Sequence, residues 1–414
     1  MEAFRKATKR PMVGDASGTI LSLVASGAAR TRLELTRVTG FSRSTVADRL
    51  AFLGEGGLVE ERLQARPARG RPTRQLCLNP NCAVVLTADI GESHTQLAVM
   101  DLGCKVLAET GRDMDIHDGA VPMLEWIVGQ FQELLITIGR GSSETLGIGL
   151  GLPAQIDFES GRVVAPSLMT GWEDFDIRGW LGARIDAPVT VENEVNLMAI
   201  SEHQRFWPNV EHLFFIKAGT GIGSGIIANG RIYRGARGAA GEIGHIQVES
   251  PDGPLCRCGM LGCLEARASG WALARDLRAV GLRADSARDV VALVKANRAE
   301  AVQRVREAGR ILGKVVADIG CLLNPGAIVV GGALTRAEDH LLVGLRGAFF
   351  QRALPLVTKG LILETARAEP STCVHLGAAL LVIESAFSPE RVDQTLSRHW
   401  RARPQAPGRR PYAA

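Results

Sequence analysis

The 414-residue chain has no uninterrupted apolar run long enough to cross a membrane, and no charged-then-apolar secretory leader at its N-terminus. Both absences predict a cytoplasmic protein without a membrane partner. Eight cysteines in a chain of this size do not make a disulfide framework. A composition with 46% hydrophobic and 22% charged residues is typical of globular proteins, and the length predicts two or three domains.

The net charge of +4 is distributed unevenly along the chain. Residues 1–80 hold 14 Lys and Arg against 7 Asp and Glu, and the last 17 residues add five arginines and no acidic residue. The long middle of the chain is therefore acidic, as in ordinary enzymes and sensors. A basic excess confined to the N-terminal module predicts a polyanionic partner for that module.

Local patterns divide the chain into five segments of an α/β protein. Residues 1–16 are predicted to be a disordered basic N-terminus, and 391–414 a basic Pro- and Arg-rich tail, without apolar periodicity from Ser397 onward. Residues 17–80 are helical with a basic end, whereas 81–190 and 191–390 mix strands and helices. Short β-branched runs predict strands, and longer periodic patterns predict helices, at these positions: strands at 84–86, 96–100, 146–150 and 327–330; helices at 121–138 and 300–323.

Residues 33–53 have the pattern of a helix-turn-helix. One short helix should stop at Thr39-Gly40, and a second should begin with Ser42 or Ser44 as its cap. Spacings of four and three place an apolar stripe of Val46, Leu50 and Leu53 on one face of the second helix. The opposite face carries small hydroxyls and arginines that suit the major groove of DNA: Arg43, Ser44, Thr45, Asp48 and Arg49.

A predicted hairpin follows this helix pair, with strands at 58–62 and 75–78 and an arginine-rich tip. The tip includes Arg69-Gly70-Arg71-Pro72, which matches the core of arginine hooks that enter the narrow minor groove. Helix pair and hairpin together predict a winged helix-turn-helix that binds double-stranded DNA. The alternative is a three-helix interaction module whose arginines only keep it solvated.

Four residues of segment 241–265 form a Cys3His set: His245, Cys256, Cys258 and Cys263. Three thiolates and an imidazole predict a closed tetrahedral zinc site with a structural role, because no coordination position stays open for catalysis. The alternative, three unrelated buried thiols and a core histidine, gives no reason for the glycines at 259 and 262.

In this segment and in several shorter motifs, the sequence resembles the ROK family of sugar kinases and repressors. The most specific part is Gly241-Glu242-Ile243-Gly244-His245 followed by Cys256-x-Cys258-Gly259-x-x-Gly262-Cys263-x-Glu265. Weaker motifs support it: Asp89-Ile90-Gly91, Gly147-x-Gly149-x-Gly151-x-Pro153, Gly219-Thr220-Gly221-Ile222-Gly223-Ser224-Gly225 and Gly331-Gly332.

The resemblance implies an actin-like, hexokinase-like pair of α/β lobes around a cleft. It also implies a set of residues that hold sugar hydroxyls: Asn193, Glu194, Glu242, His245 and Glu265. Zinc on one nitrogen of His245 would aim the other at a sugar oxygen. Simpler alternatives remain: Glu242 and Glu265 as solvated carboxylates, and Asn193 as a helix cap.

Two departures from the kinases of the family argue against efficient phosphoryl transfer. Glu194 stands where the kinases carry the Asp that acts as general base, so the catalytic carboxylate would be displaced. The phosphate turn reads Gly91-Glu92-Ser93-His94 in place of Gly-Gly-Thr-Lys. Glu92 would place negative charge near the ATP phosphates, and the Lys is replaced by His94, whose unperturbed pKa leaves it mostly neutral at pH 7. ATP and Mg²⁺ would use the glycine-rich motifs only if the chain is a kinase: Asp89, Gly91, Gly219, Thr220, Gly221, Gly223, Gly331 and Gly332. Packing by the glycines of 219–225 is the alternative.

Three hypotheses follow. The first is a DNA-binding regulator of carbohydrate metabolism, a repressor in the form of a homodimer or homotetramer, controlled by a sugar or sugar phosphate. The second is an ATP-dependent hexose or amino-sugar kinase with a DNA-binding head. The third is a zinc-stabilised scaffold that binds no sugar.

Overall fold

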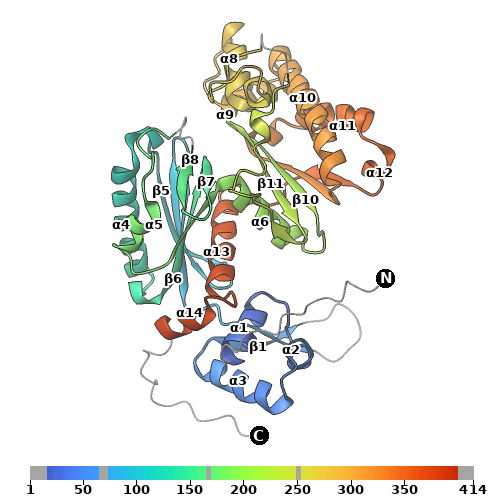
Figure 1. Ribbon diagram of the computed structural model, residues 1–414. Helices are drawn as coiled ribbons and strands as arrows, with labels where there is room; N and C mark the ends of the chain where they lie inside the picture. The colour runs from blue at the N-terminus through green and yellow to red at the C-terminus, as the bar shows by residue number, and fades with distance from the viewer. Residues whose placement is uncertain (1–15, 65–72, 165–168, 249–252, 400–414) are drawn as a thin grey trace.

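The computed structural model describes residues 16–64, 73–164, 169–248 and 253–399 (Figure 1). An N-terminal head lies at one end of the molecule, beside the first of two lobes, and each lobe is built on its own five-stranded sheet. Within the described residues, no helix is both long and apolar enough to span a membrane.

The head consists of three helices and one antiparallel strand pair. The helices are α1 (Ala16–Ala25), α2 (Arg32–Thr39) and α3 (Arg43–Glu55), and β1 (Val59–Gln64) pairs with β2 (Thr73–Leu78). These elements confirm the helices and strands that the sequence predicts for this segment. The predicted tip of the hairpin, with Arg69, Gly70 and Arg71, lies outside the described residues.

Local chemistry fixes the turn between α2 and α3. Gly40 ends α2 with a φ of 72°, a left-handed conformation that costs glycine little. Ser42 is the cap of α3, because its hydroxyl accepts a hydrogen bond from the Thr45 amide at 3.1 Å. The predicted apolar stripe of α3 is buried in the core of the head: Val46, Leu50 and Leu53.

The two lobes repeat one sheet topology. In each sheet the first strand is central, pairs antiparallel with the second and parallel with the fourth, and the strand order is 3-2-1-4-5. The first sheet confirms the predicted strands of residues 84–150: β3 (Val84–Ile90), β4 (Thr95–Asp101), β5 (Val106–Arg112), β6 (Thr145–Leu152) and β9 (Val189–Asn193). The second contains the predicted strand at 327–330: β10 (Leu213–Ala218), β11 (Ile222–Ala228), β12 (Arg231–Ile232), β13 (Ala327–Gly331) and β14 (Ile362–Thr365). A separate small pair is formed by β7 (Gln155–Asp157) and β8 (Arg162–Val164).

Helices cover the outer face of each sheet. On the first sheet these are α4 (Ala120–Thr137) and α5 (Ile177–Gly182), which share one core with alternate residues of β3. The second lobe has a larger outer layer, in which the predicted helix at 300–323 is the longest member: α7 (Leu264–Ala268), α8 (Gly270–Ala279), α9 (Ala287–Lys295), α10 (Ala299–Leu323), α11 (His340–Arg352) and α12 (Pro355–Thr358).

Two helices lie between the sheets (Figure 1). Helix α6 (Glu194–Phe206) packs on β10 and β11, while α13 (Cys373–Ala386) packs on β3 and β6, and the two helices contact each other. The predicted border at 190/191 therefore requires correction. It falls inside β9, a strand of the first sheet, and α13 lies on the first lobe although it comes late in the chain. The parallel pairing of β9 with β6 places the border after β9.

The C-terminal helix α14 (Val392–His399) forms the first part of the predicted tail, and it extends past Ser397, where the sequence predicts that disorder begins. Val392 is buried and Leu396 is partly buried in a core shared by the head, the first sheet and α13. Arg398 also pairs with Asp186 of the first lobe. A short amphipathic helix is stable here because it covers α1, which comes from the opposite end of the chain.

Candidate functional site

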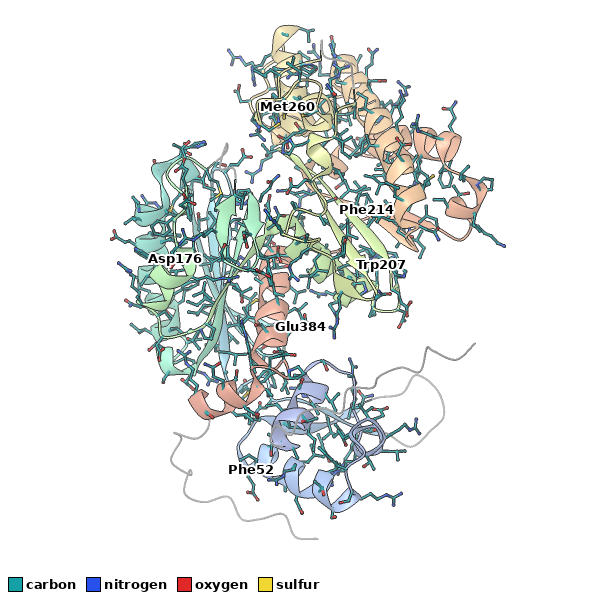
Figure 2. The ribbon with its side chains drawn as sticks, viewed as in Figure 1. Phe52, Asp176, Trp207, Phe214, Met260 and Glu384 are labelled. Atoms are coloured by element: carbon teal, nitrogen blue, oxygen red, sulfur yellow. The ribbon has the colours of Figure 1, made fainter. Side chains whose placement is uncertain are left out.

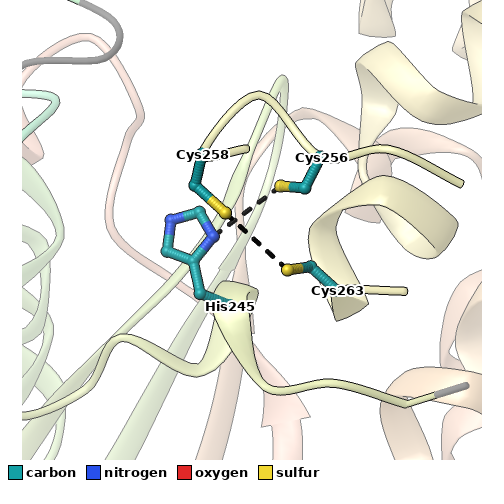
Figure 3. A group of neighbouring side chains, drawn as sticks. All are labelled: His245, Cys256, Cys258 and Cys263. Atoms are coloured by element: carbon teal, nitrogen blue, oxygen red, sulfur yellow. Dashed lines mark hydrogen bonds between the residues drawn. The ribbon is translucent and has the colours of Figure 1, made fainter. Parts of the chain in front are cut away.

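The four residues predicted to bind metal come together in the second lobe. His245 ends a short 3-10 helix, and the three cysteines lie on the loop that enters α7. Their ligand atoms all lie within 4.8 Å of one another (Figure 3). Nδ1 of His245 is 3.8 Å from Sγ of Cys256, and Sγ of Cys258 is 3.8 Å from Sγ of Cys263.

This donor set fits a zinc ion. Tetrahedral zinc–thiolate bonds of about 2.3 Å place neighbouring sulfurs about 3.8 Å apart, which is the separation found between Cys258 and Cys263. Burial raises the pKa of the Cys256 thiol, and that of Cys263 to about 12, so neither thiol ionises by itself at neutral pH. A bound divalent cation would reverse this, because a coordinating thiol is deprotonated.

Backbone hydrogen bonds and two glycine turns support this loop. The amide of Cys256 donates to the carbonyl of Met260 at 2.8 Å, and Gly259 and Gly262 turn the chain with positive φ values of 89° and 73°. The loop is also tied to the segment after His245, because the amide of Val248 donates to the carbonyl of Gly262. The structure therefore explains both glycines of the cysteine motif.

Glu265 lies at the centre of a polar cluster beside the metal ligands. Its side chain is 7% exposed, and it accepts hydrogen bonds from the amide of Ile222 at 3.1 Å and from the indole of Trp271 at 3.3 Å. Arg257, which stands between Cys256 and Cys258 of the candidate metal site, bridges Glu265 at 3.3 Å and Glu92 at 3.2 Å. Glu92 belongs to the first lobe, so this arginine joins the two lobes. The alternative of a solvated Glu265 is wrong.

Glu194 is paired with a lysine that sequence analysis missed. It opens α6, and its carboxylate accepts a hydrogen bond from the ammonium of Lys217 on β10. Burial alone would lower the pKa of Lys217, but the charge and hydrogen bond of Glu194 outweigh it, so the pKa is raised. The ammonium therefore stays charged and neutralises the carboxylate that stands at the predicted general-base position.

Asp89 lies at the end of β3, and the charges of Glu194 and Lys217 both affect its pKa. Burial and then the charge of Glu194 raise its pKa to about 7, against the opposing charge of Lys217. Its side chain is buried, and no group in the described part of the chain donates a hydrogen bond to its Oδ1. Asp89 is thus a buried carboxyl group with a raised pKa and an unused acceptor.

Asn193 is a helix cap, as the simpler interpretation of the sequence held. Its Oδ1 accepts a hydrogen bond from the amide of Val195 at 2.8 Å, and its Nδ2 donates to the carbonyl of Ala154 at 2.9 Å. The second hydrogen of Nδ2 is left for a ligand. The preceding Glu192 is neutralised by Arg234 of the second lobe, at 2.6 Å.

Glu242 lies near Glu265 and His245 without an ion pair of its own in the described residues. Burial raises its pKa, while a hydrogen bond from Gln155 acts in the opposite direction. The loop that carries it is fixed to β11, because the hydroxyl of Ser224 donates to the carbonyl of Gly241 at 2.7 Å. The Nδ1 of His245 faces Cys256, which leaves Nε2 for another partner.

The comparisons with known proteins agree with this geometry. Residues 85–385 match the ROK family. The chain belongs to the ROK family. Its two repeated α/β lobes have the actin-like, hexokinase-like fold of the family, as the sequence predicts.

Individual relatives in the ROK family divide into two kinds. A glucokinase from Halalkalibacterium halodurans is 30% identical over 74% of this chain and 97% of its own. A putative xylose repressor from a Caldicellulosiruptor species is 28% identical over 86% of this chain and 92% of its own. The crystal structure of a ROK family transcriptional regulator, described as a homologue of the E. coli MLC protein, covers 93% of this chain and 98% of its own with a TM-score of 0.76 at 24% identity.

The glycine-rich motifs at 91, 219–225 and 331–332 lie at three places in this ROK fold. Gly223 and Gly225 pack directly on α6, where side chains would meet Val195 and Ala199, so packing explains these two glycines. Gly91 begins the turn between β3 and β4, and Gly219, Thr220 and Gly221 form the turn between β10 and β11. Gly331 and Gly332 line a separate cavity of about 250 Å³, together with Thr335, Arg336 and Arg367.

In the head, the predicted DNA-contacting face of α3 is solvent-exposed at Arg43, Ser44 and Arg49, whereas Thr45 is half-buried. The hydroxyl of Thr45 is 2.8 Å from that of Ser42, so it supports the start of the helix. Phe52, 57% exposed, extends the outer face of α3, and the metal loop with Met260 lies at the far end of the molecule (Figure 2).

Sequence analysis missed the cationic partners of the predicted carboxylates: Lys217, Arg234 and Arg257. One signal was available for Lys217, because it stands alone in the otherwise apolar run Leu213–Ala218. The arginines gave no signal, since neither lies near its inter-lobe partner in sequence.

Proposed function

We propose that this chain is a winged helix-turn-helix repressor of carbohydrate genes whose DNA affinity is set by a sugar bound between its lobes. The observation that carries the proposal is the core shared by head and sensor. Residues of α1 and α3, of β3 and β6, and of α13 and α14 pack into one hydrophobic cluster. A displacement of α13, one of the two helices between the lobes, would therefore shift residues that pack directly against the head.

The extent of the relatives supports the same proposal. A match over 86% of the chain must enter the first 84 residues, since the remainder is only about 80% of the sequence. The xylose repressor thus resembles this chain in the head as well as in the sensor. DNA would be bound by the exposed face of α3, through Arg43, Ser44, Thr45 and Arg49, with help from Arg69, Gly70 and Arg71 at the hairpin tip. Two heads of a homodimer would occupy two half-sites.

The sugar would be held at the start of α6 and around the metal loop. The donors and acceptors proposed for its hydroxyls are those predicted from the sequence: Asn193, Glu194, Glu242, His245 and Glu265. Asn193 contributes its second amide hydrogen, and His245 its Nε2, held in place by structural zinc on Nδ1. Carboxylates that accept hydrogen bonds from O–H groups suit a polyol.

Selection of DNA from a random pool by the full-length protein, with and without candidate sugars, tests head, sensor and coupling together. We expect enrichment of a two-fold symmetric sequence, and a several-fold change in its retention with at least one sugar. A coupling energy of about 1–3 kcal/mol corresponds to a factor of about 5–150 in affinity. Loss of enrichment in Arg43→Ala, with the fold intact, would assign the contact to α3.

The glucokinase relative makes an ATP-dependent sugar kinase the second candidate. Glu194, the proposed base, is occupied by Lys217, and the phosphate turn carries Glu92 in an ion pair with Arg257. Both features oppose transfer of a negatively charged phosphoryl group. A coupled assay of ADP release decides the matter: sugar-dependent turnover that Glu194→Ala abolishes would establish the kinase, which would use Asp89, Gly91 and the glycine turns for ATP and Mg²⁺.

A further inference from the structure

We propose that the effector is an unphosphorylated sugar and that the anionic charge of the site excludes sugar phosphates. This inference rests on the proposed function, because it concerns the ligand of the same site. It follows from the charges around the predicted sugar-binding residues and from the ion pairs that the cations there already form.

Carboxyl groups outnumber cations around the site. Six carboxyl groups interact with one another or with the histidines and cations there: Asp89, Glu92, Asp113, Glu194, Glu242 and Glu265. Three cationic side chains belong to the same network: Lys217, Arg257 and Arg288. His94 adds little positive charge to the network, since burial lowers its pKa.

Two of these three cations are already paired with carboxylates. Lys217 donates to Glu194, and Arg257 divides its guanidinium between Glu92 and Glu265. A phosphate that took either cation would leave a buried or half-buried carboxylate uncompensated. Arg288 is exposed, and its effect on His94 is opposed by Asp113.

The unused hydrogen-bonding capacity of the site suits a neutral ligand. Oδ1 of the buried Asp89 lacks a donor within the described residues, and Glu242 has only the hydrogen bond from Gln155. Both groups can accept a hydrogen bond from a sugar hydroxyl. A phosphate ester carries nearly two negative charges at neutral pH and offers acceptors where acceptors are already in excess.

Matched pairs of probes test this inference: glucose, N-acetylglucosamine and xylose, each beside its own terminal phosphate ester. Binding to the full-length zinc-loaded protein is measured by titration calorimetry, and release of the selected DNA is measured in parallel. We expect the free sugar of the binding pair to bind at least about tenfold more tightly than its ester at low salt. The ratio of sugar affinity to ester affinity should decrease at high salt, because salt screens the repulsion between the phosphate and the carboxylates.

Glu92→Gln identifies the cause. Removing this charge should reduce the ratio between sugar and ester several-fold, while Glu109→Gln, on the exposed side of β5 in the same lobe, should leave it unchanged. An ester that binds as tightly as its sugar, or a ratio that Glu92→Gln does not alter, overturns the inference and leaves the proposed function standing. If no member of any pair binds, the sugar-responsive function fails, and this inference fails with it.

Discussion

A buried histidine and a buried aspartate should oppose each other in the acid stability of this protein. His375 on α13 is 2% exposed, and its Nδ1 lies 2.9 Å from the hydroxyl of Thr87 on β3. That hydroxyl donates to the carbonyl of Ala98, so the imidazole acts as the donor to Thr87. Burial lowers the pKa of His375 to about 4 and raises that of Asp89 to about 7.

The two shifts have opposite signs in the free energy of unfolding. Between pH 4 and 6.5 the unfolded chain protonates His375 while the native protein does not, so this residue makes stability fall as the pH is lowered. Asp89 is protonated in the native state and ionised in the unfolded chain between about pH 4 and 7, so it makes stability rise as the pH is lowered. At 1.36 kcal/mol per unit, each contributes about 3–4 kcal/mol across its window, and the two nearly cancel.

Single substitutions should expose each contribution. We expect Asp89→Asn to lose about 3 kcal/mol between pH 6.5 and 4 relative to wild type, and His375→Asn, which keeps a donor toward Thr87, to gain a similar amount. Each kcal/mol corresponds to about 2–4 °C for a domain of this size. Melting temperatures of both variants, taken against wild type at each pH to cancel shared acid effects, provide the measurement. Parallel pH profiles for all three proteins would refute the assignment.

Four further predictions test other contacts. Cys258→Ser should abolish stoichiometric zinc in elemental analysis and lower the melting temperature, and full retention of zinc would contradict the Cys3His site. Gly377→Ala should cost about 1–3 kcal/mol, because its new methyl group would overlap the carbonyl oxygen of Leu197 where α13 crosses α6; a melting temperature equal to that of wild type would argue against this packing. Val392→Asp buries an unpaired charge between α14 and α1, so it should weaken DNA binding without changing sugar affinity. Arg49→Ala should leave stability unchanged and reduce the slope of log affinity against log salt concentration by about 1. For either variant, a DNA affinity equal to that of wild type in gel shifts would contradict the prediction.

Local patterns predicted much of this protein. The strand at 327–330, the helix at 300–323 and the cap at Ser42 depend on neighbours in sequence, and all are found. The metal ligands could likewise be proposed because three of them lie within eight residues. In both cases the determining contacts are short in sequence.

Features that depend on distant parts of the chain were not predictable. Helix α14 is short, has only two large apolar residues, Val392 and Leu396, and is stabilised by α1, nearly the whole chain away. The place of β9 is set by pairing with β6, and Arg257 joins the lobes through Glu92, which lies far away in the sequence. Spacing in the sequence gives no measure of such contacts, which arise from tertiary packing.

The short connection between head and first lobe has a consequence for operator geometry. Only residues 79–83 separate β2 from β3, and they are fastened on both sides: Asn79 donates to the carbonyl of Gly57 in the head, and the carbonyl of Asn81 accepts from Arg140 in the lobe. Because α14 also packs on α1, contacts on two sides hold the head on the first lobe, and each head of the proposed dimer would keep this orientation. One inserted base pair between half-sites rotates the second half-site by about 34–36° around the duplex axis. A head held rigidly on its lobe cannot turn to follow that rotation.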